Sequence, residues 1–176
     1  MKARIKIIII ALILGAIPFA IGLTQPKERL ITEMAVIDKM YYFIIADITN
    51  HWEEPAWRHD LDTMIQQQVV DGQDAWMEYY TNGDSVLLIT QKIAETDYIR
   101  IIHRPDGKQL MRIITVADFK GKTAIRMSEE DFVTNPYKRF MYLVNDPIRK
   151  RIQNYLTDLT EKNKPDPNAE NLENSN

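Results

Sequence analysis

The stretch NPYKRFMYLVNDPIRKRIQNYLTDL, residues 135–159, is the longest helical pattern that follows the N-terminal apolar run. Its apolar residues recur at spacings of three and four, which places them on one face of a helix. A stripe of this length and aromatic content is expected to pack against another part of the fold. Its members are Tyr137, Phe140, Met141, Val144, Ile148, Ile152, Tyr155 and Leu159.

Two prolines define how this helix is expected to run. Asn135 is a preferred N-cap residue, and Pro136 suits the first helical position. Pro147 lies inside the pattern, where it removes a backbone hydrogen bond, so a kink is predicted near Asn145 and Asp146. The stripe is therefore predicted to belong to one long, kinked helix.

The residues before this helix follow the two-residue period of β-strands. Gly72, Gly83, Gly107 and Gly121 each lie in a polar turn, and the turns are about twelve residues apart, as an antiparallel meander requires. Short helices are expected over residues 39–58. The predicted strands are residues 29–37, 61–70, 75–80, 85–94, 98–104, 109–119 and 123–133.

Residues 7–23 carry no charge and follow a short N-terminal segment with three basic residues. At about 1.5 Å per residue, this run reaches the lower limit of a bilayer-spanning helix. We expect an N-terminal transmembrane helix that acts as an uncleaved signal anchor, with the following domain extracytoplasmic, either periplasmic or at the cell surface. The alternative is a cleavable signal peptide, with Ala20-Ile21-Gly22 as its small-x-small cleavage site, and a secreted domain.

Composition argues against several classes of function. Three of the 22 basic residues lie within residues 1–26, which contain no acid, so the rest of the chain is more acidic than the formal net charge of −3. An acidic domain is poorly suited to nucleic acid, whose phosphates require a basic surface. The chain has no cysteine, which excludes disulfides and thiolate metal sites. His51, His59 and His103 lack the spacing of a metal site, and no metal or cofactor is expected.

The order of strand, short helices, six strands and long helix predicts an α+β fold. An apolar sheet face needs a cover, and the stripe of the last helix matches it. We therefore expect a helix-grip, a curved antiparallel β-sheet wrapped around a long C-terminal helix. The predicted organisation is a transmembrane segment and linker over residues 1–26, the helix-grip domain over 27–161, and a polar, disordered tail over 162–176.

Three stretches resemble the START-like superfamily, also called the polyketide cyclase-dehydrase or SRPBCC superfamily. Residues 47–57, with Trp52 and Trp57, resemble its Trp-x-x-Trp region, although two glutamates precede the proline where the family often has Trp-Pro-x-Trp. Residues 123–137 resemble its last strand and Asn-Pro entry, and the helix that follows is the third match. The resemblance covers residues 29–160. It implies the same fold, with a hydrophobic small molecule or lipid held between sheet and helix.

The family resemblance and the apolar stripe of residues 135–159 together indicate candidate ligand-binding residues. Trp52 and Trp57 would rim a cavity, since large flat apolar groups grip lipids and ring systems. Alternatively, they seat the short helices on the sheet. In the same way, the helix and sheet residues that face each other either line a ligand space or fill a solid core. These are Tyr137, Met141 and Val144 on the helix, opposite Met77, Tyr79 and Ile113 on the sheet.

Three functional hypotheses follow. The leading one is a membrane-tethered domain, held through residues 7–23, that captures a hydrophobic small molecule or lipid without catalysis. The second is an enzyme of cyclase or hydrolase type in the same cavity, with His59 or Glu129 as proton carrier. The third is a structural or partner-binding envelope protein with a filled core.

Overall fold

Seven antiparallel strands form one sheet in the computed structural model, which describes residues 14–165. Their order across the sheet is β1-β7-β6-β5-β4-β3-β2, so consecutive strands from β2 to β7 are neighbours in space. The first strand pairs with the last. The strands are β1 (Glu28–Ile37), β2 (Leu61–Gln66), β3 (Asp74–Tyr80), β4 (Ser85–Lys92), β5 (Asp97–His103), β6 (Gln109–Phe119) and β7 (Lys122–Phe132).

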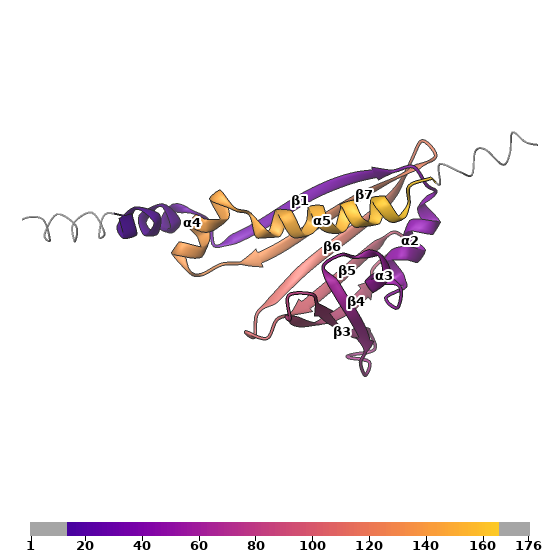
Figure 1. Ribbon diagram of the computed structural model, residues 1–176, viewed down its shortest axis with the longest axis horizontal. Coiled ribbons are helices and arrows are strands. Elements are labelled where there is room, and N and C mark those ends of the chain that lie inside the picture. The colour runs from indigo at the N-terminus through magenta and orange to yellow at the C-terminus, as the bar shows by residue number, and fades with distance from the viewer. Residues whose placement is uncertain (1–13, 166–176) are drawn as a thin grey trace, which may run out of the picture.

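Helices cover one face of this sheet. The short helices α2 (Tyr41–Thr49) and α3 (Glu54–Trp57) connect β1 to β2, and α4 (Pro136–Val144) and α5 (Pro147–Lys162) follow β7. Helix α5 lies along the sheet and contacts β1 and β7, as Figure 1 shows. This arrangement confirms the predicted α+β helix-grip. Residues 14–24 are also helical and lie at the same end of the molecule as α4 (Figure 1).

Two turn glycines show why the meander needs them. Gly83, between β3 and β4, has a φ of 88°, and Gly121, between β6 and β7, has a φ of 80°. Residues with a Cβ rarely adopt these angles. The predicted strands are confirmed with small shifts at their ends, except that β2 ends at Gln66 and not at residue 70.

The long helix is interrupted at the position predicted for a kink. Helix α4 ends at Val144, and α5 begins at Pro147. The side chain of Asp146 caps α5, because it accepts hydrogen bonds from the backbone N–H groups of Ile148 and Arg149, both at 3.2 Å. Pro147 thus occupies the first position of a new helix, where its missing N–H leaves no bond unmade. The prediction of one kinked helix is wrong, because the Asp-Pro pair starts a second helix.

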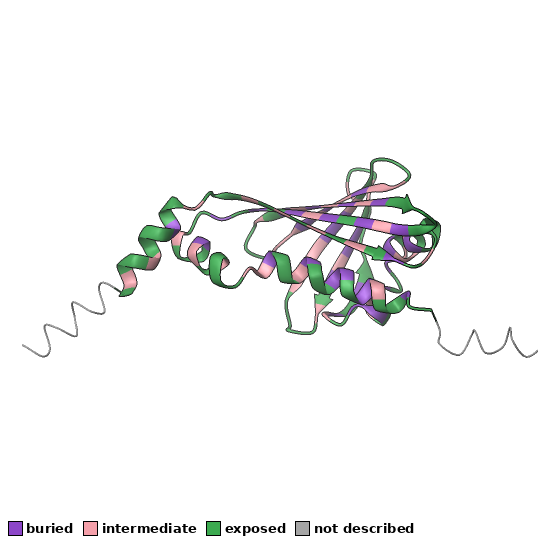
Figure 2. Ribbon diagram, turned by 90° about the horizontal axis from the view of Figure 1, so that it is seen from above, coloured by how far each residue is buried: buried purple, intermediate pink, exposed green. Residues whose placement is uncertain are grey.

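One face of α5 is buried against the sheet. Ile148, Ile152 and Leu159 form a single apolar cluster with Ile114 of β6 and Met127 of β7. Figure 2 shows the buried bands along α5, in contrast to the exposed helix of residues 14–24. At about 1.5–3 kcal/mol for each large apolar side chain, this burial is the main force that holds α5 on the sheet. A second apolar cluster comprises Leu61, Met64, Trp76, Leu88, Ile102 and Leu110.

The predicted transmembrane segment lies partly outside the described residues, which begin at residue 14. Within residues 14–165, no helix combines the length and the hydropathy that a membrane span requires. At the other end, α5 continues to Lys162, and the rest of the predicted tail from residue 166 onward lies outside the described residues.

Candidate functional site

Charged side chains are buried between the sheet and α5, where apolar residues are the rule. Arg100 of β5 lies directly opposite Arg112 of β6, which in turn lies opposite Glu129 of β7. All three share the sheet face of Ile114 and Met127, which α5 covers. The buried charged residues of this layer are Glu54, Arg58, Glu78, Arg100, Arg112, Glu129 and Asp131.

Glu54 of α3 is the centre of a first group of charges and is 0% exposed. Its carboxylate accepts hydrogen bonds from His51 at 2.7 Å, Arg58 at 3.0 Å and Arg100 at 2.6 Å. Burial would raise the pKa of Glu54, but Arg100, the His51 hydrogen bond and Arg58 outweigh it and hold the pKa well below its ordinary value of 4.5. Glu54 therefore stays ionised and ties α3 to β5.

Arg58, at the end of α3, extends this group to β3. Its Nη1 also donates to Glu78, at 2.7 Å, and its Nε and Nη2 donate to Asp60, both at 3.2 Å. Tyr80 donates a short hydrogen bond to Glu78. Burial and the charge of Glu78 raise the pKa of Tyr80, so its phenol stays protonated. We call this internally paired group the Glu54 cluster; it comprises His51, Glu54, Arg58, Glu78 and Arg100.

Tyr155 of α5 lies among the arginines. The guanidinium carbons of Arg58, Arg100 and Arg112 are 5.4, 5.7 and 5.7 Å from its ring centroid, within the range of cation–π attraction. Trp57 packs edge-on against the same ring, with the centroids 5.3 Å apart. Burial raises the pKa of Tyr155 to about 12. A neutral aromatic ring on the helix therefore contacts three charged residues and helps to fix them.

A second group, the Glu129 cluster, comprises Arg112, Glu129 and Arg151. Arg112 donates to one oxygen of Glu129 from Nε at 3.1 Å and from Nη2 at 2.9 Å. Arg151 of α5 donates to the other oxygen, from Nε at 2.9 Å and from Nη2. Burial would raise the pKa of Glu129, but Arg112 and Arg151 outweigh it and hold the pKa below its ordinary value of 4.5. One carboxylate is thus shared by two guanidinium groups.

Replacing Glu129 by glutamine is expected to flatten the dependence of stability on acid pH. A carboxylate with a depressed folded-state pKa adds stability above its unfolded pKa, and that stability is lost as the pH falls through the folded pKa. The free energy of unfolding of the wild type should therefore fall between about pH 5 and pH 3, and less steeply in Glu129→Gln. Urea denaturation at a series of pH values measures both slopes. Glu130→Gln, at the exposed next position, should keep the wild-type slope; equal slopes in all three proteins would contradict the assignment.

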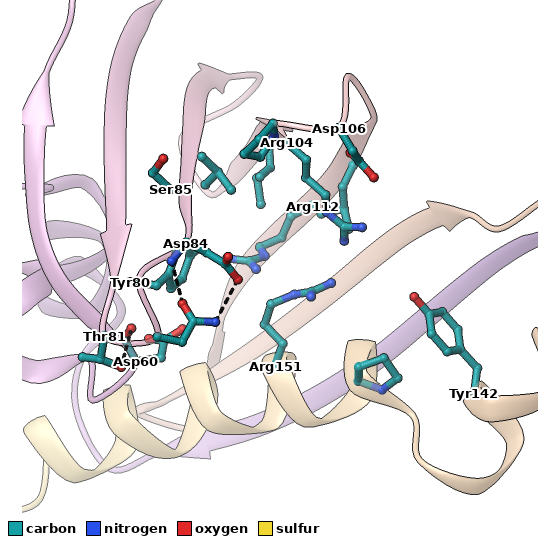
Figure 3. A pocket seen from close by; sticks show the side chains of 16 residues that line it. Asp60, Tyr80, Thr81, Asp84, Ser85, Arg104, Asp106, Arg112, Tyr142 and Arg151 are labelled. Atoms are coloured by element: carbon teal, nitrogen blue, oxygen red, sulfur yellow. Dashed lines mark hydrogen bonds between the residues drawn. The ribbon is translucent and has the colours of Figure 1, made fainter. Parts of the chain in front are cut away.

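A cavity of about 620 Å³ lies beside the Glu129 cluster, between the sheet and the start of α5. Figure 3 shows Arg104, Arg112 and Arg151 around it, with Arg151 reaching in from α5. Its volume is that of a small-molecule site. The apolar part of its lining is Tyr80, Val86, Ile102, Pro105, Leu110, Tyr142 and Pro147, and the polar part is Asp60, Thr81, Asn82, Asp84, Ser85, Arg104, Asp106, Arg112 and Arg151.

The two tryptophans nominated from the sequence do not line this cavity. Trp52 is 66% exposed and packs edge-on against Trp76, with the ring centroids 4.8 Å apart. Trp57 is buried between Tyr155 and Lys162. Trp57 therefore packs α3 against α5, whereas the alternative drawn from the sequence was a contact with the sheet.

The nominated sheet residues lie on the outer face of the sheet. Side chains alternate along a strand, and the inner positions next to Met77 and Tyr79 on β3 include Glu78. On β6 the inner position next to Ile113 is Arg112. The prediction that Met77, Tyr79 and Ile113 face the helix is wrong. Buried charged residues occupy the inward-facing positions of these strands, so the three predicted residues point to the opposite side of the sheet.

The nominated helix residues belong to α4 and are exposed. Tyr137, Met141 and Val144 contribute to neither apolar core cluster of the described chain. Helix α4 instead contacts the helix of residues 14–24, where the Tyr137 hydroxyl donates to the carbonyl oxygen of Gly15 at 3.2 Å. The predicted stripe is thus divided, since only its second half, on α5, covers the sheet.

The two residues predicted as proton carriers, His59 and Glu129, are not positioned to act as an acid or a base in the cavity. His59 lies at the surface with its side chain 78% exposed and is hydrogen-bonded to Asp158 at 2.7 Å, which raises its pKa. Glu129 is held as a carboxylate between two arginines. Neither residue lines the cavity. The geometry therefore gives no support to these two residues as carriers in a cyclase or hydrolase reaction.

Arg100 and Arg112 are two of the buried charged residues that sequence reasoning missed. Each lies in the middle of a strand and is flanked on both sides by apolar residues. A charge in such a position is rarely buried unless it is paired. An arginine at the centre of each of two consecutive apolar strands is therefore a signal that could have indicated a buried ion-pair layer.

Comparison with solved structures relates the fold to known proteins. A START superfamily protein from Mycobacterium smegmatis matches with a TM-score of 0.62 and 9% sequence identity, over 76% of this chain and 96% of that one. The Zhui aromatase/cyclase from Streptomyces matches with a TM-score of 0.64 and 3% identity, over 77% and 93%. The protein Ara h 8.0201 matches with a TM-score of 0.59 and 10% identity, over 77% and 97%.

These likenesses concern the fold, because the sequence identities are too low to carry more. A scan of protein-family models finds no match, and neither does a search of curated proteins. The structural matches nevertheless cover nearly the full length of all three proteins. The chain therefore has the START-like helix-grip fold that its sequence resemblance implies.

Proposed function

We propose that this chain binds a hydrophobic small molecule or lipid in the cavity between the sheet and α5. The observation that carries the proposal is the cavity of about 620 Å³ itself. Val86, Ile102 and Leu110 supply apolar surface, and the polar residues of the lining supply groups that can orient a ligand. A solved structure of similar fold is described as an aromatase/cyclase.

Different side chains of α5 support different parts of this proposal. Ile148, Ile152 and Leu159 are completely buried in the main apolar cluster, so the core is filled beneath this face of the helix. The cavity instead adjoins the start of α5, at Pro147 and Arg151. A filled core therefore holds the helix in place, and the ligand space lies beside it.

The proposal includes a membrane tether through residues 7–23. The helix of residues 14–24 contains the second part of this run and packs closely on the start of α4, since a Cβ at Gly22 would overlap the carbonyl group of Pro136. Tyr142 of α4 also lines the cavity, which would place the cavity near the bilayer. Exposed apolar side chains suit an interfacial position. They are Leu14, Ile17, Phe19, Ile21, Leu23, Tyr137, Met141, Leu143 and Val144.

Replacing Val86 by phenylalanine is expected to reduce ligand capture, because Val86 lines the cavity and the larger side chain would occupy ligand space. Native mass spectrometry of the full chain, extracted from membranes, measures the bound species. The wild type should carry a hydrophobic molecule, and Val86→Phe should bind it at least about tenfold more weakly, a loss of about 1.4 kcal/mol, and so show a lower bound fraction.

Leu87→Phe is the matched control, because Leu87 is the next residue of β4, on the outer face, and does not line the cavity. It should retain the ligand. A wild-type domain that is empty, and whose melting temperature no hydrophobic compound shifts, would contradict binding. Recovery of the full chain in the soluble fraction would contradict the tether.

A further inference from the structure

Arg112 presents an unused hydrogen-bond donor next to the cavity. The side chain is 1% exposed, and its Nε and Nη2 both donate to Glu129. Its Nη1 has no hydrogen-bond partner within residues 14–165, although the residue lines the cavity. A buried guanidinium N–H without an acceptor costs free energy. Nη1 has almost no accessible surface, so an acceptor atom of a ligand in the cavity would satisfy it after a small shift of the Arg112 guanidinium group.

The Glu129 cluster, to which this donor belongs, has a net positive charge. Arg112 and Arg151 share the single carboxylate of Glu129, so this cluster has one positive charge in excess. Arg104 also lines the cavity, and its ion pair with Asp131 spans 3.6 Å, too long for a hydrogen bond. A ligand group with negative charge would therefore be attracted to the guanidinium groups.

The acidic residues of the lining form their hydrogen bonds and ion pairs with groups other than Arg112. Asp60 accepts both of its hydrogen bonds from Arg58, in the other cluster. Asp84 accepts from the side chain of Asn82 at 2.8 Å. Asp106 lies 3.7 Å from the Lys108 ammonium group. Each of these carboxylates is engaged with another partner, and none is bonded to Arg112.

We propose that the ligand is an anionic amphiphile, with a carboxylate or phosphate head on Arg112 and an apolar body on Val86, Ile102 and Leu110. This inference rests on the proposed function and names the chemical class that the cavity takes. Arg112 Nη1 would donate to the head, and Arg104 and Arg151 would add positive charge around it. The head could come from a free fatty acid or from a phosphate ester, and the two sources share the same charged oxygen chemistry.

Three probes of equal chain length test the proposal on the full chain in phosphatidylcholine nanodiscs. Octanoate, octyl phosphate and octanol are titrated by isothermal calorimetry, with empty nanodiscs as the blank. At least one anion should bind about tenfold or more tightly than octanol, as a charged hydrogen bond would provide. The preference between octanoate and octyl phosphate distinguishes the two sources of the head.

Arg112→Gln should abolish the preference for the anion while octanol binding changes little. Arg126→Gln removes the same charge from the exposed face of β7 and should keep the wild-type preference. Glu129→Gln provides an independent arm, because it frees both arginines of their shared carboxylate and should tighten anion binding several-fold. Weaker anion binding in folded Glu129→Gln would overturn the inference.

The outcomes also separate this inference from the proposed function. Equal binding of octanol and both anions by the wild type would overturn the anionic head and leave the cavity function in place. Binding of none of the three probes would overturn the cavity function and the inference with it. A preference that persists in folded Arg112→Gln would overturn the role of Arg112.

Discussion

Replacing Glu54 by glutamine is expected to lower the free energy of unfolding by about 3–5 kcal/mol, the loss typical of a buried ion pair deprived of one partner. The amide keeps the shape of the carboxylate but removes the charge that balances Arg100. The other acceptors of Arg100 are the neutral carbonyl oxygen of Ile48, at 2.5 Å, and the Tyr155 hydroxyl, at 3.5 Å. Glutamine also places an N–H₂ donor where only acceptors fit. Urea denaturation followed by tryptophan fluorescence measures the loss.

Glu53→Gln is the matched control for this variant. Glu53 is the neighbouring residue, its side chain is 61% exposed, and its ion pair with Lys162 spans 3.5 Å. An exposed pair of this kind contributes little, so the control should stay within about 0.5 kcal/mol of the wild type. Equal losses in the two variants would show that Glu54 does not hold α3 on the sheet.

The strands could be predicted because their signals are local. Turn glycines with positive φ, such as Gly83 and Gly121, mark the chain reversals, and the segments between them are rich in β-branched residues. The predicted bounds of β4 to β7 agree with the structure to within about two residues, the usual uncertainty of element ends. The helix-grip then follows, because one apolar sheet face needs a cover.

The side of the sheet to which each side chain points could not be predicted in the same way. The rule that apolar residues point inward selects Met77 and Tyr79 over Glu78, and Ile113 over Arg112. In the structure Glu78 and Arg112 are the inward residues, because partners from α3 and from β7 compensate their charges. Those partners are distant in sequence, so no local pattern reports them. For this reason the sequence assigns Met77, Tyr79 and Ile113 to the side of the sheet that faces the helix, whereas they lie on the outer face.

The division of the helical stripe has a different physical cause. The spacing of apolar residues continues through Pro147, so periodicity alone indicates one helix. The capping bonds of Asp146 show that the chain starts a new helix there. The residues before the break are free to leave the sheet and contact the helix of residues 14–24. A cap residue before a proline inside a periodic pattern is the signal that could have indicated the break.

Replacing Ile152 by alanine is expected to lower the free energy of unfolding by about 2–5 kcal/mol, the range for a large-to-small substitution in a packed core. Ile152 is completely buried in the main cluster with residues of β6 and β7. The loss combines the lost burial of the side chain and the space left behind. Urea denaturation of the full chain measures it.

Val144→Ala tests the other half of the stripe. Val144 is 71% exposed at the end of α4, so this variant should stay within about 0.5 kcal/mol of the wild type. Losses of similar size in both variants would mean that α4 covers the sheet as α5 does. Because Ile152 does not line the cavity, Ile152→Ala should also keep the wild-type preference among amphiphiles at temperatures where it is folded. A variant that loses stability but keeps its ligand preference would separate the residues that hold the helix on the sheet from those that recognise the ligand.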